Sequence, residues 1–216
     1  MGPIGILHED EHLIVVDKPP GVLTVPAPGR TGSSLVDVLR RQLGREIHAV
    51  HRLDEDTSGA MILAGSIPAR QALEGLFRSH AVERLYLALL TAVPSPPSGR
   101  IEARLQESGG IVRVVKRGGK VAVTNYRVLE RRGTACLVEC RLETGRRNQI
   151  RVHLAELGCP LAGDRKYGYR RRAGEDYRRV MLHSWRLSLV HPISGERLSF
   201  EAEAPEVELR PGAGES

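Results

Sequence analysis

Short strand-like segments that follow one another without helical periodicity constrain this chain more than any other feature. Apolar or alternating runs occupy residues 100–106, 111–116, 120–130 and 134–143, and turn-forming residues separate them. Neighbouring strands joined by short connections pair antiparallel, because parallel strands require long crossovers. The sequence therefore predicts an α+β fold with a largely antiparallel sheet.

Further strands and three helices are expected around this region. The strands are predicted at 4–8, 13–17, 60–64, 82–92, 186–190 and 197–202. The helices are predicted at 35–43, with Ser33 or Ser34 as N-cap, at 68–78 and at 149–157. Strands outnumber helices, which agrees with the α+β class.

Composition excludes several classes of protein. No apolar run approaches the roughly 18–20 residues of a membrane-spanning helix. The first five residues lack the basic and apolar regions of a signal peptide. Three cysteines cannot build a disulfide framework, and with no metal-ligand spacing they are interpreted as buried thiols rather than zinc ligands. We expect a cytoplasmic protein with no membrane segment.

The positive charge of the chain is concentrated in one region. Residues 113–179 contain 18 Lys or Arg and 7 Asp or Glu, a net charge of +11, against +6 for the whole chain. Within it, residues 165–172 interleave tyrosines with arginines, which suits phosphate binding and base stacking on RNA. The alternative is a solvated loop of an arginine-rich chain, since 28 of the 32 basic residues are arginine.

The segment His51-Arg52-Leu53-Asp54-Glu55-Asp56-Thr57-Ser58-Gly59 concentrates groups that could perform chemistry. Its three acids repel one another unless a cation such as Arg52 intervenes. An aspartate kept ionised in a sheltered cleft can act as nucleophile or electrostatic stabiliser. The same residues could instead form a polar turn, with Asp56, Thr57 and Ser58 as capping groups and Gly59 permitting the backbone turn, and both interpretations stay open.

A second candidate segment, residues 144–153, joins a predicted strand to a predicted helix. Gly145 permits a tight turn, Asn148 is expected to cap the helix, and a helix start is a natural anion site. Arg151 and His153 would point in different directions, so at most one of them is expected to share a cleft with Asp54. A surface helix with a cationic first turn is the alternative.

Several motifs occur in a fixed order along the chain. They are Leu13 to Gly21, His51-Arg52-Leu53-Asp54 with Thr57-Ser58-Gly59, Arg84 to Ala88, Gly145-Arg146 with Gln149 to Leu154, Gly163-Asp164 with Tyr167-Gly168, and Leu182-His183 with His191-Pro192. In this order they resemble the RluA family of pseudouridine synthases. The resemblance extends from about residue 6 to residue 204.

The resemblance implies a fold and an activity. The fold would be the pseudouridine synthase catalytic fold, a mixed, mainly antiparallel sheet with a central cleft and flanking helices. It would form a single catalytic domain over 1–204. Independently of the resemblance, the chain end over 205–216 is expected to be a loosely ordered tail. The activity would be the isomerisation of specific uridines in structured ribosomal or transfer RNA to pseudouridine, on a flipped-out nucleotide and without a cofactor or metal.

The resemblance also implies roles for individual residues. Asp54 would be the catalytic aspartate, Tyr86 would lie beside the target base, and Arg151 would pair with Asp54 and keep it ionised. Arg52 would help to fill the gap left by the extruded nucleotide. The charge pattern and these motifs taken together predict that RNA is bound by His51, Arg52, Arg146, Arg147, Lys166, Arg170, Arg171 and Arg172.

Two departures from the family pattern matter. Asn148 stands where the family commonly has histidine, which leaves the RNA contact at this position undefined. The motifs start within the first twenty residues, so we expect that the small N-terminal RNA-binding domain of many relatives is absent. RNA would then be held by residues 113–120 and 165–179 of the catalytic domain.

Two other functions remain open at this level. One is a non-catalytic RNA-binding protein that retains the fold. The other is a hydrolase that uses Asp54 to cleave a glycosidic bond and release free uracil. Nothing in the sequence indicates an obligate interface, so we expect a monomer.

Overall fold

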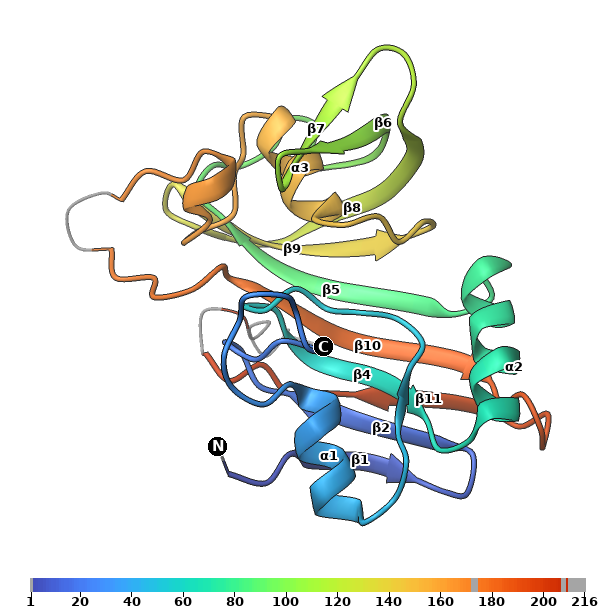
Figure 1. Cartoon of the computed structure of the whole chain (residues 1–216). Helices are drawn as coiled ribbons and strands as arrows, with labels where there is room; N and C mark the ends of the chain where they lie inside the picture. The colour runs from blue at the N-terminus through green and yellow to red at the C-terminus, as the bar shows by residue number, and fades with distance from the viewer. Residues whose placement is uncertain (1, 172–174, 207–208, 210–216) are drawn as a thin grey trace, which may run out of the picture. The chain divides into compact units, whose positions relative to one another are not determined.

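The computed structural model describes residues 2–171, 175–206 and 209, and its contacts divide the chain into two compact units. Unit 1 comprises Met1–Arg84 and Ser184–Glu203, and unit 2 comprises Leu85–His183 and Ala204–Ser216 (Figure 1). The single catalytic domain over 1–204 stays a prediction. Most of the tail over 205–216 lies outside the described residues, so its loose order stays a prediction too.

The sheet of unit 1 is built on two central strands that are buried on both faces. Its strands follow the order β1 (Gly5–Glu9), β2 (Leu13–Lys18), β4 (Ser58–Ala64) and β10 (Leu182–Val190), with β11 (Arg197–Glu201) paired to β10 and β3 (His48–Ala49) paired to β4. β10 belongs to unit 1 from Ser184 onward. The pairs β1–β2, β2–β4, β3–β4 and β10–β11 are antiparallel.

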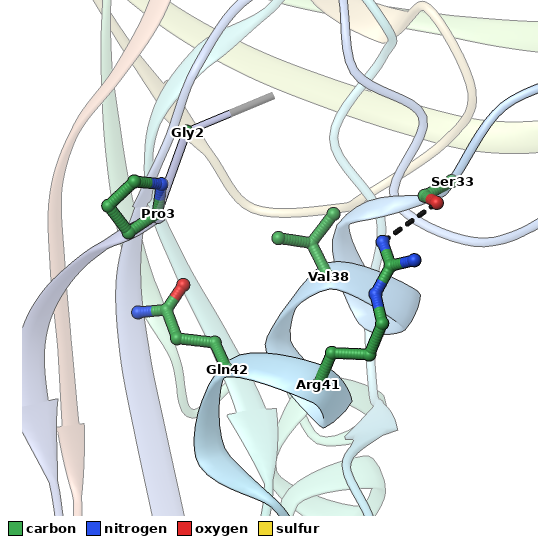
Figure 2. Close-up of a pocket in the computed structure, with 6 residues that line it drawn as sticks. All are labelled: Gly2, Pro3, Ser33, Val38, Arg41 and Gln42. Atoms are coloured by element: carbon green, nitrogen blue, oxygen red, sulfur yellow. Dashed lines mark hydrogen bonds between the residues drawn. The ribbon is translucent and has the colours of Figure 1, made fainter.

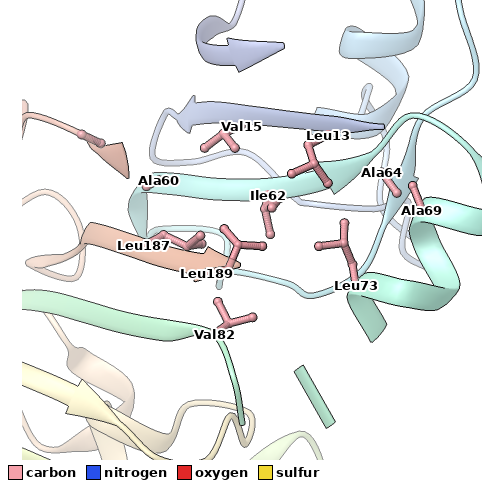
Figure 3. Packing of buried hydrophobic residues seen from close by; sticks show 11 residues of the cluster. Leu13, Val15, Ala60, Ile62, Ala64, Ala69, Leu73, Val82, Leu187 and Leu189 are labelled. Atoms are coloured by element: carbon pink, nitrogen blue, oxygen red, sulfur yellow. The ribbon is translucent and has the colours of Figure 1, made fainter. Parts of the chain in front are cut away.

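One face of these strands forms the core that Figure 3 shows. Leu13 and Val15 of β2 and Ile62 of β4 pack with Leu187 and Leu189 of β10. Side chains on the opposite face of β2 and β4 are fully buried as well, namely Ile14, Val16, Met61 and Leu63. Covering on both faces explains why these segments are continuously apolar rather than alternating.

Two helices complete unit 1, α1 (Leu35–Leu43) and α2 (Ile67–Arg78), and the latter packs against β4. The Ser34 hydroxyl accepts a hydrogen bond from the Asp37 N–H, and the Asp37 carboxylate accepts one from the Ser34 N–H, which is a complete capping box. Gly44 ends the helix at φ 63°, where glycine carries no steric cost. The predicted span of 35–43 is confirmed.

Unit 2 is an antiparallel sheet with one helix against it. Its strands follow the order β5 (Glu83–Leu90), β9 (Ala135–Leu142), β8 (Lys120–Arg132), β6 (Ser98–Ser108) and β7 (Ile111–Val115), where β5 belongs to the unit from Leu85 onward. Helix α3 (Gln149–Glu156) packs against β6, β7 and β8 and buries Val152 against Leu105, Val112 and Ala122. A short 3-10 helix, η1 (Arg165–Tyr167), was not expected.

The predicted fold class is confirmed, since the sheets are mainly antiparallel and the helices are few. The central cleft stays a prediction. Cys136, Cys140 and Cys159 are free, buried thiols, as expected. In the described part of the chain, no helix is long and apolar enough to cross a membrane, and no cluster of His, Cys, Asp or Glu could hold a metal ion.

Ser34→Ala tests the contribution of the capping box. We expect the free energy of unfolding to fall by about 1 kcal/mol, because the Asp37 N–H loses its acceptor at the start of α1. Urea denaturation monitored by circular dichroism measures the change. The control is Ser33→Ala, one residue earlier and exposed, which should change stability by less than about 0.5 kcal/mol. Equal effects of the two substitutions would contradict a specific cap.

Candidate active site

Asp54 lies in unit 1, in the loop over residues 50–57 that joins β3 to β4. The Thr57 N–H donates a hydrogen bond of 3.1 Å to the Asp54 carbonyl, so the turn expected from the residues is present. Leu53 is buried beside it, whereas Arg52 is exposed and Asp54 is partly buried. A buried apolar neighbour and a hydrogen-bonded turn fix the backbone on which the Asp54 carboxylate is carried.

The strongest restraint on this loop is a buried cation that the sequence analysis did not single out. Lys18, the last residue of β2, is 0% exposed. Its ammonium group donates to the carbonyl oxygens of Pro19 at 3.0 Å, Glu55 at 2.9 Å and Thr57 at 2.8 Å. Burying a charge is costly unless hydrogen bonds compensate, and these three acceptors supply them. Two of the three belong to the Asp54 loop.

The turn after β2 adds two further ties to the same loop. The Thr24 hydroxyl donates to the Leu53 carbonyl at 3.1 Å, and the Gly21 N–H donates to the Glu55 carbonyl at 2.9 Å. Gly21 has φ 76°, a conformation that a residue with a side chain adopts only with strain. The residues on both sides of Asp54 are therefore held by the segment that follows β2.

His51, predicted to bind RNA, makes scaffold contacts at the start of the loop. Its Nε2 accepts a hydrogen bond of 3.2 Å from the Ile62 N–H, and its ring stacks on Phe77 with centroids 4.5 Å apart. Burial, and then the positive charge of Arg84, lower the pKa of His51 to about 3. The ring is thus neutral near pH 7 and offers no charge to a phosphate. An RNA contact by His51 stays a prediction, and these contacts favour a positioning role.

Tyr86 and Arg151 lie in unit 2. Tyr86 is 6% exposed on β5, opposite Cys140 of β9. Arg151 lies on α3 and makes a two-point ion pair with Asp164, with Nε–Oδ2 and Nη2–Oδ1 distances of 2.7 and 2.8 Å. The carboxylate of Asp164 is 1% exposed, so it is a buried partner for this arginine that sequence reasoning missed. The pairing of Arg151 with Asp54 stays a prediction.

The turn that carries Asp164 depends on the glycine before it. Gly163 has φ 77°, and a Cβ there would collide with the Arg179 carbonyl oxygen. The Asp164 carbonyl accepts hydrogen bonds from the N–H groups of Tyr167 and Tyr169, at 3.2 and 3.0 Å. The Gly163-Asp164 motif thus positions the carboxylate that pairs with Arg151. The basic segment that begins at Arg165 follows it directly.

Most of the remaining basic residues predicted to bind RNA lie on the surface of unit 2. Arg146 and Lys166 are exposed and donate to the carbonyls of Val121 and Gly110, and exposed Arg147 pairs with Glu107. Two separate stretches of sequence, at Arg146-Arg147 and at Lys166, are therefore joined to the region of β6–β8. Arg170 is exposed, exposed Arg171 donates to the Glu175 carbonyl, and Arg172 lies outside the described residues. RNA binding by these residues stays a prediction.

A pocket of about 530 Å³ elsewhere in unit 1 contains none of the motif residues. Figure 2 shows its lining: Gly2, Pro3, Ser33, Val38, Arg41 and Gln42. The polar groups there are already engaged, since Arg41 donates to the Ser33 hydroxyl and the Gln42 amide bonds to both the N–H and the carbonyl of Ile4. We therefore take the Asp54 loop of unit 1 and the Arg151–Asp164 pair of unit 2, not this pocket, as the candidate functional groups.

Comparison with known proteins connects these groups to a family. Residues 12–156 match the model of a family described as RNA pseudouridylate synthase. Two curated relatives, both named ribosomal large subunit pseudouridine synthase D, are 38% identical in Zymomonas mobilis and 41% identical in Neisseria meningitidis serogroup A. Each alignment covers 94% of this chain, but 70% of the first relative and 59% of the second. The chain thus spans between half and three quarters of their length.

Solved structures show the same fold. Human RNA pseudouridylate synthase domain containing 4 superposes with a TM-score of 0.78 at 30% identity, over 93% of this chain and 88% of that chain. Human RNA pseudouridylate synthase domain containing 1 has the same TM-score at 26% identity, over 95% of this chain and 87% of that one.

Lys18→Met tests the anchoring of the Asp54 loop. We expect the free energy of unfolding to fall by roughly 3 kcal/mol, because buried carbonyls lose a charged donor that a thioether cannot replace. Chemical denaturation measures the loss, and Lys116→Met, at an exposed position of unit 2, is the control. A change below about 1 kcal/mol would mean that the ammonium group does not hold the loop.

Proposed function

Because the chain belongs to the RluA family of RNA pseudouridylate synthases, we propose that it isomerises uridine to pseudouridine in RNA, with ribosomal RNA of the large subunit as its substrate class. The observation that carries the proposal is the extent of the family match. Residues 12–156 include Lys18, Asp54, Tyr86 and Arg151, the anchor of the loop and all three residues of the predicted site. Transfer RNA is the second substrate to test.

The reaction breaks the bond between N1 of uracil and C1′ of ribose and forms a bond between C5 and C1′. The proton on C5 leaves, and N1 gains one, so the exchange needs no oxidant, reductant or external energy source. The target base must be extruded from the RNA, which costs a few kcal/mol. We assign Asp54 the attack on the ribose or the base, and Tyr86 a place beside the base where it assists removal of the proton.

The restraints described above support this assignment. A nucleophile is effective when its position is fixed before the substrate arrives, because less freedom is lost at the transition state. Lys18 and Thr24 hold the backbone on both sides of Asp54. We assign Arg151, oriented by buried Asp164, to keep Asp54 ionised.

RNA is proposed to bind through the exposed basic side chains of unit 2. They lie in the segment 113–120 and in the described part of 165–179, where lysines and arginines alternate with glycines and tyrosines. Such a surface binds phosphates without reading sequence, so the choice of uridine would rest on the shape of the RNA. A cytoplasmic location, supported by the three free thiols, and a monomeric state belong to the same proposal.

Asp54→Asn tests the proposed activity directly. Transcribed large-subunit and transfer RNA labelled with tritium at uracil C5 release the label when the new bond forms. We expect release by the wild type and a loss of at least about 1,000-fold in Asp54→Asn, because an amide is a poor nucleophile. The matched control is Asp56→Asn, two residues further along the same loop, which should keep most of the activity.

Three outcomes would contradict the proposal. RNA binding without release of tritium from either RNA would favour a non-catalytic RNA-binding protein. Free uracil and an abasic site would identify a hydrolase. Equal activity of Asp54→Asn and the wild type would show that Asp54 is not the catalytic residue.

Substitution of Arg170 and Arg171 together by glutamine tests the RNA surface. We expect weaker binding and a smaller slope of log K against log salt concentration. The slope should fall in magnitude by about 1 to 2, since each lost phosphate contact removes about 0.7 to 0.9 from it. The control is the double substitution of Arg70 and Arg78 by glutamine on α2 of unit 1, where the slope should not change. Binding at several salt concentrations measures both, and an unchanged slope in the Arg170 and Arg171 variant would exclude phosphate contact.

A further inference from the structure

Asn148 does not cap helix α3 as expected from the sequence. It stands at the N-cap with φ 53° and ψ 22°, and its side chain makes no capping hydrogen bond. Asparagine is among the few residues besides glycine that adopt this left-handed conformation readily. The conformation leaves its amide for other partners: Nδ2 donates to the Tyr167 hydroxyl at 2.8 Å, and Oδ1 accepts from Nη1 of Arg151 at 3.3 Å. The residue is only 7% exposed, so these contacts are shielded from water.

Tyr167 contacts Asn148 and Arg151 with different parts of its side chain. Its hydroxyl oxygen accepts a second hydrogen bond, of 3.1 Å, from the Val112 N–H of β7. Its ring lies 5.1 Å from the guanidinium carbon of Arg151, within the range of a cation–π contact. The tyrosine therefore touches the arginine with its ring, while its hydroxyl is fixed by α3 and β7.

Arg151 is consequently restrained in more than one direction. The two-point pair with Asp164 fixes one edge of the guanidinium group. These two bonds engage Nε and Nη2 but place no atom against the face of the group and none on Nη1. The Tyr167 ring lies against its face, and the Asn148 oxygen holds Nη1, which Asp164 does not contact in these bonds. Together with the Asp164 pair, these contacts determine the orientation of the whole guanidinium group.

We propose that Asn148 and Tyr167 are positioning residues for Arg151, and that they set the rate of isomerisation rather than the affinity for RNA. The proposal rests on the proposed function, because it gives the orientation of Arg151 a catalytic purpose. Neither residue needs to touch the substrate.

Two substitutions separate the contacts. Tyr167→Phe keeps the ring over Arg151 and removes the hydroxyl, and Asn148→Gly keeps the left-handed backbone and removes the amide. With labelled RNA and enzyme in excess, each should lower the single-turnover rate by roughly 10- to 100-fold, as expected for a misplaced catalytic group. The dissociation constant for RNA should change less than about twofold, since no phosphate contact is lost. The double variant should be no slower than the slower single one, because the residues act as a unit.

The matched control is Tyr126→Phe, which removes another buried hydroxyl from unit 2, one that donates to the Pro96 carbonyl. It should keep the wild-type rate. Wild-type rates in both Tyr167→Phe and Asn148→Gly would overturn the proposal. Loss of RNA affinity with an intact rate per bound complex would overturn it as well, because that result belongs to a purely structural role. If the wild type itself forms no pseudouridine, the proposed function fails, and the positioning role fails with it.

Discussion

The hydrogen bonds of the Lys18 ammonium group determine where the Asp54 loop lies. An ammonium group without exposure to water is stable only if its donors are satisfied, and here backbone carbonyls of the turn and of the loop satisfy them. Lys18 can reach these carbonyls because β2 and β4 pair in a register that sets Lys18 opposite Gly59, at the end of the loop. The apolar packing that fixes this register thereby also positions the candidate catalytic aspartate.

The same principle recurs in unit 2 with the charges reversed. Asp164 is a buried carboxylate, and Arg151 is the cation that satisfies it. Removing either partner would leave an uncompensated charge, so the pair restrains both the α3 helix and the turn at Gly163. In each unit, one group of the predicted site is held by a buried ionic group that takes no part in the proposed chemistry.

Local patterns predicted most of the helices and strands, though not β3 or η1, and they did not predict these anchors. The span of α1, the strands of unit 2 and the buried thiols follow from periodicity, capping residues and composition, which act over a few residues. Lys18 was missed because its acceptors are main-chain oxygens 37 and 39 residues away, which no side-chain pattern reveals. The capping role predicted for Asn148 was wrong because its backbone is left-handed rather than extended and its Oδ1 accepts from Arg151 instead. For His51, burial and the positive charge of Arg84 lower the pKa and keep the ring neutral, and neither cause is visible in the motif.

A map of pseudouridine in cellular RNA tests the central claim most directly. Large-subunit ribosomal RNA and transfer RNA would be compared between cells with the gene, without it, and complemented with either the wild type or Asp54→Asn. The account predicts at least one uridine of the large-subunit RNA that is modified only where the wild-type protein is present. An unchanged map, or a modification restored equally by Asp54→Asn, would contradict it.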